Sequence, residues 1–326
     1  MIEILLKEWI ERVKYYIHLI ADYSIKESQV GAVLDDVLNL SGKMLRSKLL
    51  LLCAFLGSNW KNNKEKICKL AAMVELTHLA SLIHDDIVDD SPYRRGKVSV
   101  QGKYGKDAAV FAGDFLIARI FYYGAVENLN EAVSILSKTV EYMCIGEIEQ
   151  DLCRYQEDIS EKKYFENIER KTAALFQAAS YIGAKEAGCS EKIIQKLGLF
   201  VKNLGLMFQL KDDILDFTSN SKELGKETHK DFQNGIYTFP VIMALKNLKA
   251  KEVLLPIMRK NKEEKLSLAE ILQLQNYIIQ FGGIEASYEK IKYLSNINRQ
   301  LIKELGQNSK ITVYLEKILN DLEVEN

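Results

Sequence analysis

The sequence predicts an all-α protein, and three observations support this fold class. Apolar residues recur at helical spacing along nearly all of the 326 residues, and strand candidates bounded by turn residues are scarce. The chain has only 3 Pro and 18 Gly, too few for the many tight turns of a sandwich or a propeller. Apolar residues make up 48% of the chain, as in ordinary globular proteins. We expect a single large helical bundle over residues 1–326, with a core over about 40–245 and outer C-terminal helices over about 250–326.

Helix signals can be placed in order along the chain. Residues 64–90 are apolar at helical spacing and predict one long helix. Asn128 with Glu131, and Ser267 with Glu270, are capping-box patterns that predict two helix starts. We expect loops at 58–63, 91–104, 218–233 and 282–283. The second and third of these loops are long for a helical bundle, and long connections in compact proteins are usually functional or disordered.

Charge and cysteine content exclude several classes of function. The 44 basic and 45 acidic residues give a net charge of −1, so no overall positive field would attract nucleic acid. The five cysteines are widely spaced without a C-x-x-C pair, which indicates reduced thiols. The longest uninterrupted apolar stretch, 49–56, is far below the roughly 18 residues of a membrane-spanning helix. We expect a cytoplasmic protein with no transmembrane segment and no nucleic-acid partner.

The string His-Asp-Asp-Ile-Val-Asp-Asp at 84–90 carries carboxylates at helical spacing. On a helix, Asp85 and Asp89 lie one turn apart on the same face, and Asp86 is their neighbour. Three carboxylates this close repel one another unless a cation lies between them. Mg²⁺ binds one or two protein carboxylates together with waters and substrate phosphates. For one such motif alone, a solvated acidic helix end is an equally good interpretation.

A second copy of the D-D-x-x-D spacing favours the metal site. This copy consists of Asp212, Asp213 and Asp216. Each copy is followed by a segment with cations, Arg94 and Arg95 after the first and Lys226 and Lys230 after the second. Paired carboxylate clusters with nearby Arg and Lys are typical of a site that holds a diphosphate through metal ions and charge-assisted hydrogen bonds.

The helix that leads to the first cluster has a polar face made by His78, Ser81, Asp85 and Asp89, at steps of three and four residues. One turn before the carboxylates, the residues at and beside this face are small, Ala80 and Ser81, rather than aromatic. A polar mouth above an apolar tunnel would suit a substrate with a charged head and a hydrocarbon tail. The alternative for the small residues is close packing of helices.

With these motifs the sequence resembles the trans-isoprenyl diphosphate synthases, in particular medium- and long-chain polyprenyl synthases and the catalytic subunit of heptaprenyl diphosphate synthases. The matching strings occur in the family's order: SGKMLR at 41–46, HLASLIH at 78–84, DDIVD at 85–89, RRGK at 94–97, GDFL at 113–116, GEIEQ at 146–150, KTA at 171–173, FQLK at 208–211 and GK at 225–226. Ser41 and Ser47 depart from the Gly and Pro that are usual in the family. The resemblance implies an isoprenoid synthase-type fold, with helices around a central cavity.

The resemblance also implies roles for individual residues. Both Asp clusters would hold Mg²⁺, three ions in each active site, on an allylic diphosphate. The residues that would contact this diphosphate directly are Arg94, Lys171 and Lys226. Those that would bind isopentenyl diphosphate are Lys43, Arg46, His78 and Arg95. Those that would line the reacting region are Gln150, Thr172 and Gln209. The implied reaction is ionisation of the allylic diphosphate, condensation in trans and loss of a proton.

Product length in this family depends on what blocks the tunnel. The fourth and fifth positions before Asp85 are Ser81 and Ala80 rather than aromatics, which predicts a product longer than four isoprene units. The next block would lie near Met143. We expect a product of about C30–C50, with heptaprenyl favoured. The resemblance implies a homodimer, or a heteromer with a small regulatory subunit.

Several alternatives stay open at this point. The enzyme could make a shorter farnesyl or geranylgeranyl diphosphate. A non-catalytic partner subunit is disfavoured, because such subunits usually lose the Asp clusters. A metal phosphohydrolase built on His84 and Asp85 would leave the second cluster unexplained. A terpene cyclase is the nearest enzymatic competitor, but the pair Lys43 and Arg46 favours chain elongation.

Overall fold

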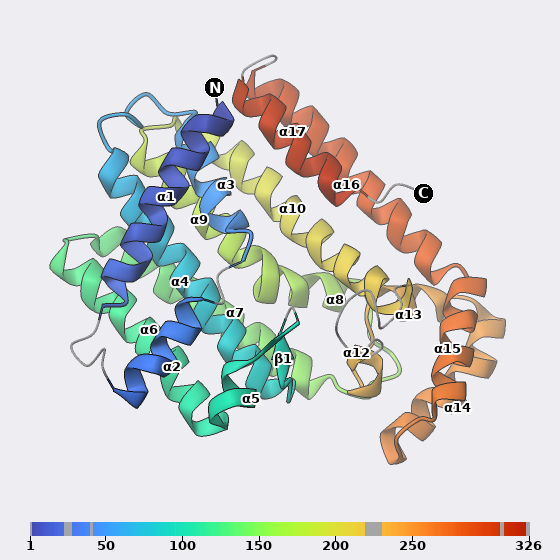
Figure 1. The fold of residues 1–326 in the computed structure, drawn as a ribbon. Coiled ribbons are helices and arrows are strands. Elements are labelled where there is room, and N and C mark those ends of the chain that lie inside the picture. Colours follow the sequence, from blue (N-terminus) through green and yellow to red (C-terminus); the bar gives the residue numbers. More distant parts are fainter. Residues whose placement is uncertain are drawn as a thin grey trace. The chain divides into compact units, whose positions relative to one another are not determined.

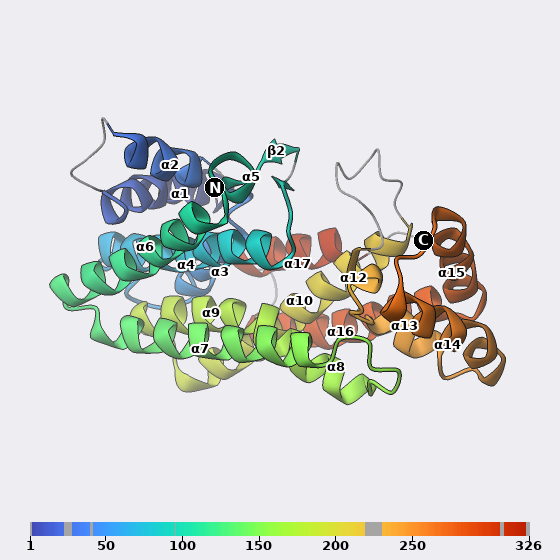
Figure 2. The ribbon, with the colours of Figure 1, turned by 90° about the horizontal axis from the view of Figure 1, so that it is seen from below.

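The computed structural model describes residues 2–22, 28–39, 42–94, 96–218, 230–306 and 310–323. This part of the chain is almost entirely helical (Figures 1 and 2), which confirms the all-α class. The helices group into two compact units that interleave in sequence: unit 1 is built mainly from Met1–Val140 and Leu175–Leu199, and unit 2 from Glu141–Ala174, Phe200–Asn308 and Thr312–Asn326. The expectations of a single domain and of a central cavity stay predictions.

Unit 1 contains most of the N-terminal elements. They are α1 (Ile2–Ile20), α2 (Gln29–Leu38), α3 (Leu45–Ala54), α4 (Lys64–Val88), β1 (Tyr93–Arg94), β2 (Lys97–Val98), α5 (Val100–Tyr104) and α6 (Lys106–Val126). The two short strands pair antiparallel within 91–104, the segment predicted to be a loop. Three further helices contribute residues to both units, namely α7 (Asn130–Leu152), α9 (Ala174–Glu186) and α10 (Glu191–Thr218).

Unit 2 contains the remaining elements. They are α8 (Glu161–Ile168), a single turn of π-helix η1 (Glu169–Ala173), α12 (Lys230–Gln233), α13 (Phe239–Ala244), α14 (Leu248–Glu263), α15 (Leu268–Gln280), α16 (Gly283–Leu305) and α17 (Lys310–Leu322). Helices α14 and α15 lie side by side in Figures 1 and 2. Most of the predicted loop at 218–233 lies outside the described residues.

Helix α4 is the central helix of unit 1 and packs against α1, α3 and α6 (Figure 1). Every residue from Leu70 to Thr77 in the middle of α4 is buried, as expected of a helix that is covered by others. By length and composition alone, α4 and α6 could each cross a membrane, but 72% of the apolar window of α4 and 39% of that of α6 are buried inside the protein. Core helices of soluble proteins have the same composition, so these two helices are weak evidence for a membrane span. The long helix predicted over 64–90 is confirmed.

The two predicted helix starts have different outcomes. At α15 the capping box is complete: Ser267 Oγ accepts from the Glu270 N–H, and the Glu270 carboxylate accepts from the Ser267 N–H at 2.9 Å. The start predicted with Asn128 as the N-cap is wrong by one residue, because α7 begins at Asn130 and Leu129 precedes it. Asn128 has a φ of 56° and its N–H bonds to the Ala125 carbonyl. It therefore ends the preceding helix in the left-handed conformation that Asn tolerates.

Candidate active site

The first Asp cluster lies at the C-terminal end of α4. Asp86 is only 3% exposed, and its two carboxylate oxygens lie 2.7 and 2.8 Å from the Arg94 Nε, which donates to them. Gln101 Nε2 also donates to the backbone carbonyl of Asp86, at 2.6 Å. Asp85 is half-buried and Asp89 is exposed. The middle carboxylate is thus fixed inside the protein, and the outer two lie on the accessible side of the helix.

The second Asp cluster, on α10, also has a buried middle residue and two outer residues that are less buried. Asp213 is 1% exposed and accepts hydrogen bonds from the Tyr164 hydroxyl at 2.5 Å and from Gln209 Nε2 at 3.0 Å. Burial raises the pKa of Asp213 to about 7, although the hydrogen bonds from Tyr164 and Gln209 act in the opposite direction. Asp212 is exposed and Asp216 is half-buried.

Both clusters are electrostatically unfavourable without a cation. Each lies in the last turns of a long helix, where the helix dipole already provides negative partial charge. Within the described part of the chain, no three Asp, Glu, His or Cys side chains are gathered as a ready-made metal site. The outer carboxylates, Asp85 with Asp89 and Asp212 with Asp216, are half-buried or exposed. They are nevertheless the type of oxygen donor that Mg²⁺ prefers, and carboxylate pairs leave room for waters and phosphates. The donor set fits this ion.

Arg46 and His78, two residues expected to bind isopentenyl diphosphate, are in contact within unit 1. Arg46 Nη1 lies 2.9 Å from His78 Nε2. The Arg46 guanidinium also stacks over the Phe176 ring, 4.6 Å from its centroid, which restricts its direction. Lys43 is exposed in the segment that leads into α3. The structure therefore brings together two of the residues predicted to bind isopentenyl diphosphate, and it leaves Lys43 at the surface nearby in sequence.

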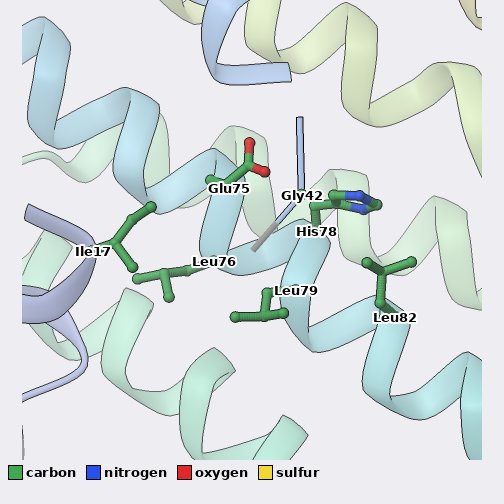
Figure 3. A pocket seen from close by; sticks show the side chains of 7 residues that line it. All are labelled: Ile17, Gly42, Glu75, Leu76, His78, Leu79 and Leu82. Atoms are coloured by element: carbon green, nitrogen blue, oxygen red, sulfur yellow. The ribbon is translucent and has the colours of Figure 1, made fainter. Parts of the chain in front are cut away.

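A small pocket of unit 1 lies beside this pair (Figure 3). Its walls come from α1, α4 and Gly42, and its empty volume is about 290 Å³ with the open space at its mouth included. The side chain of Glu75 extends to the side on which Gly42 lies, and those of Leu76 and Leu79 extend away from it (Figure 3). Glu75 is 5% exposed and lies 2.9 Å from the Ser47 hydroxyl. The pocket thus has one polar and one apolar side.

In unit 2, a π-turn positions Lys171 and Thr172. Thr172 Oγ1 donates to Gln209 Oε1 at 2.9 Å, and Lys171 Nζ lies 2.9 Å from a Glu147 carboxylate oxygen. The backbones approach closely here: a Cβ on Gly205 would lie 2.8 Å from the Ala173 Cα. Single π-turns are rare and occur frequently at functional sites. The predicted residues Thr172 and Gln209 are therefore in direct contact.

The other predicted residues have mixed placements. Arg94 lies on β1 and donates to Asp86, a contact that the sequence did not indicate. Ala80 has no exposed surface, whereas Ser81 is half-buried. Met143 and Gln150 are both half-buried on α7. Two predicted cations, Arg95 and Lys226, lie outside the described residues.

Sequence reasoning missed three residues at these sites: Tyr164, Glu147 and Glu75. Tyr164 comes 49 residues before its partner Asp213, so no local spacing connects them. Glu147 stands one position after Gly146 in a string already noted at 146–150, and its pairing with Lys171 could have been sought by charge. Glu75 comes three residues before His78 on the same helix face. That helical spacing was a usable signal.

Several known proteins are similar in sequence to this chain. The family model described as Polyprenyl synthetase matches residues 27–275. The chain is 34% identical over 265 residues to heptaprenyl diphosphate synthase component 2 of Geobacillus stearothermophilus, covering 80% of each chain. It is 37% identical over 289 residues to a prenyl transferase of Cyanidium caldarium, covering 87% of each.

Solved structures give the same result at the level of fold. A polyprenyl synthase from Caulobacter crescentus CB15, complexed with calcium and isoprenyl diphosphate, is 29% identical with a TM-score of 0.88, covering 98% of this chain and 96% of that one. A decaprenyl diphosphate synthase from Rhodobacter capsulatus is 27% identical with a TM-score of 0.87, covering 98% of both chains. The phosphohydrolase alternative is thereby overturned, and the chain belongs to the polyprenyl synthetase family of prenyl transferases.

Proposed function

We propose that this enzyme condenses isopentenyl diphosphate in trans onto an allylic diphosphate, such as farnesyl or geranylgeranyl diphosphate. One observation carries the proposal: both D-D-x-x-D copies are intact, each with a buried middle carboxylate and two outer residues that are half-buried or exposed. A non-catalytic partner subunit would have no need to keep two clusters that destabilise their own helices. The allylic diphosphate is the natural counterpart of such clusters once they hold divalent cations.

The Asp clusters would be the metal-binding residues. Asp85 and Asp89 in one copy, and Asp212 and Asp216 in the other, would hold Mg²⁺, three ions in all. Asp86 and Asp213 would complete the clusters from their buried positions. Bound Mg²⁺ would neutralise the charge that develops on the departing diphosphate.

Cationic side chains would bind the two substrates. Lys171 and Arg94, with Lys226, would contact the allylic diphosphate. Arg94 uses its Nε–H for Asp86, and its guanidinium has further N–H donors for a phosphate oxygen. Glu147 lies 2.9 Å from Lys171 Nζ and so directs its ammonium group before substrate arrives.

Isopentenyl diphosphate would bind near the Arg46–His78 pair. The residues that would hold its diphosphate are Lys43, Arg46, His78 and Arg95. Stacking on Phe176 pre-orients the Arg46 guanidinium, which lowers the entropy lost on binding. Leucines of α4 line the small pocket beside His78.

The residues of the π-turn would face the reacting carbons. Gln209 accepts from Thr172 and donates to Asp213, so the direction of its amide is fixed. Together with Gln150, these side chains would line the region where the allylic cation forms, and their dipoles would stabilise positive charge. The condensation needs no protein nucleophile. The proton lost at the end would go to the released pyrophosphate.

The product would be a medium- or long-chain all-trans polyprenyl diphosphate, about C30–C50, with heptaprenyl favoured. Ser81 is half-buried and small, which supports an open first layer, and Met143 would lie at a lower block. One observation favours the shorter farnesyl or geranylgeranyl product as second candidate: Ala80 has no exposed surface, so it packs against protein rather than lining an open channel.

The chain would act as a homodimer in the cytoplasm. On α6, Phe111, Tyr122 and Val126 are 71%, 61% and 59% exposed, and their spacing places them along one face of the helix. Large apolar side chains in a row are typical of an interface, and a second copy of this chain offers the same apolar row. A small regulatory subunit is the alternative, since a relative is named as one component of its synthase. The five described cysteines are free thiols, as expected in a reducing compartment.

Purified protein incubated with Mg²⁺, farnesyl diphosphate and labelled isopentenyl diphosphate tests the proposal. We expect a ladder of products that ends between six and ten isoprene units, and a ladder ending at three or four would favour the second candidate. Asp212→Asn, which keeps the size of the side chain, should abolish incorporation. Full incorporation by this variant would contradict the assignment of the second cluster. Phe111→Lys should give monomers in sedimentation if α6 forms the dimer.

A further inference from the structure

Tyr164 is a buried residue of α8 that none of the proposed steps uses. It is 6% exposed, and its hydroxyl donates to Asp213 Oδ2 at 2.5 Å. A phenol hydroxyl carries its proton near neutral pH, so it can donate a hydrogen bond to a carboxylate.

The ring of Tyr164 is held in place by two other aromatic rings. Its centroid lies 5.2 Å from that of Phe165 in an edge-on arrangement and 5.4 Å from that of Phe239. Phe165 and Phe239 also contact each other, at 5.3 Å. Because the ring packs on residues of both α8 and α13, the hydroxyl cannot turn away from Asp213 without disturbing this cluster.

The other oxygen of Asp213 is held as firmly. Gln209 Nε2 donates to Oδ1 at 3.0 Å, and the Gln209 carbonyl in turn accepts from Thr172. Side chains from α8 and from α10 itself thus bond to one carboxylate, and a side chain of η1 holds one of these two donors. Since Asp213 belongs to α10, fixing its carboxylate also fixes the rotation of that helix turn about its axis.

We propose that Tyr164 is a positioning residue for the second Asp cluster: its hydroxyl holds Asp213 inside unit 2, so that α10 presents Asp212 and Asp216 to a divalent cation. Consecutive residues of a helix differ in direction by about 100°. Asp212 is accordingly exposed while Asp213 is buried. The inference rests on the proposed function, because it takes Asp212 and Asp216 as the ligands.

The matched test compares Tyr164→Phe with Tyr237→Phe. Tyr237 is also buried in unit 2, 3% exposed, and its hydroxyl donates to the Met258 carbonyl at 3.4 Å, away from the cluster. Mn²⁺ binding in the presence of inorganic pyrophosphate, measured by electron paramagnetic resonance, needs no turnover. We expect Tyr164→Phe to weaken Mn²⁺ binding about tenfold, as is typical for residues that orient metal ligands. Tyr237→Phe should leave it unchanged.

The pathway through Asp213 is tested by a double variant. If Tyr164 acts through that carboxylate, Tyr164→Phe combined with Asp213→Asn should bind Mn²⁺ no more weakly than Asp213→Asn alone. The Mg²⁺ concentration for half-maximal turnover should rise with the Mn²⁺ dissociation constant in Tyr164→Phe.

Three results would overturn the proposal: wild-type Mn²⁺ affinity in Tyr164→Phe, an equal loss in Tyr237→Phe, or loss of a cooperative melt in Tyr164→Phe. The last would assign the hydroxyl to the stability of the unit rather than to metal binding. Asp212→Asn separates this inference from the proposed function. If Asp212→Asn binds Mn²⁺ with wild-type affinity, the assignment of the metal site is wrong. If Asp212→Asn loses affinity but Tyr164→Phe keeps it, only the positioning role of Tyr164 is wrong.

Discussion

Replacing Asp89 by Asn should stabilise the metal-free protein, whereas replacing Asp86 by Asn should destabilise it, although the two residues belong to the same motif. Asp89 is exposed at the C-terminal end of α4. Its charge is unfavourable there because of the helix dipole and because Asp85 lies one turn away. Asp86 is 3% exposed and bonded to Arg94, so its loss leaves a buried cation without its partner.

The two effects differ in size as well as sign. Removing the Asp89 charge relieves about 0.2–0.5 kcal/mol of repulsion from Asp85 and about 0.3–1 kcal/mol at the helix end. Solvent screening of an exposed group reduces the sum to roughly 0.5–1 kcal/mol. For a chain of this size that is a rise in melting temperature of about 1–3 °C. Breaking the buried Asp86–Arg94 pair costs about 3–5 kcal/mol, a fall of roughly 10 °C.

The assay is thermal unfolding followed by circular dichroism, in chelator and at low salt, with turnover measured separately in Mg²⁺. Asp107→Asn is the matched control, because Asp107 is exposed in the first turn of α6, where a negative charge is favourable. It should melt slightly below wild type and retain activity, whereas Asp89→Asn should melt above wild type and lose activity. A lower melting temperature for Asp89→Asn, or an unchanged one for Asp86→Asn, would refute the division into outer ligands and buried anchors.

Three further predictions concern product length, substrate binding and pH. Ser81→Phe should shorten the longest product by several isoprene units in chromatography, and an unchanged ladder would place the channel elsewhere. Arg46→Lys should raise KM for isopentenyl diphosphate about tenfold with kcat nearly unchanged, because it loses the bidentate and stacking geometry of Arg; an unchanged KM would remove Arg46 from that site. Arg299 Nη2 lies 2.6 Å from a Glu323 oxygen and lowers the pKa of Glu323. The contribution of this pair to the free energy of unfolding is therefore fully present above the pKa that Glu323 has in the unfolded chain. It is lost as the pH falls through the lower pKa of Glu323 in the folded protein. We expect the free energy of unfolding, measured with urea, to fall less between pH 5 and pH 3 in Arg299→Met than in wild type. If the two proteins lost the same free energy over this pH range, the prediction would be contradicted.

The local parts of the site could be predicted from the sequence because helix geometry is periodic. Spacing of three and four residues was enough to place His78, Ser81, Asp85 and Asp89 on one face of α4, and these residues are half-buried or exposed while Asp86 is buried. The three-residue spacing between Ser267 and Glu270 was likewise sufficient to predict the capping box.

Contacts between elements could not be predicted in this way. The Tyr164 hydroxyl meets Asp213 only because α8 and α10 pack together, and Arg94 meets Asp86 only because the chain turns back after α4 as a short strand. The π-turn also left no sign in the sequence, since Glu169–Ala173 has ordinary helical composition. Such features depend on tertiary packing, which overrides local preference.

The π-turn at Glu169–Ala173 has a consequence for how this chain can change over generations. A π-turn amounts to one extra residue inside an α-helix. Deleting a single residue there would restore regular helix and rotate every later side chain of α9 by about 100° relative to α8. A frame-preserving loss of one codon between 169 and 173 would therefore be more harmful than most substitutions in the same stretch. Outside Lys171 and Thr172, length at this point of the chain should be under stricter selection than residue identity.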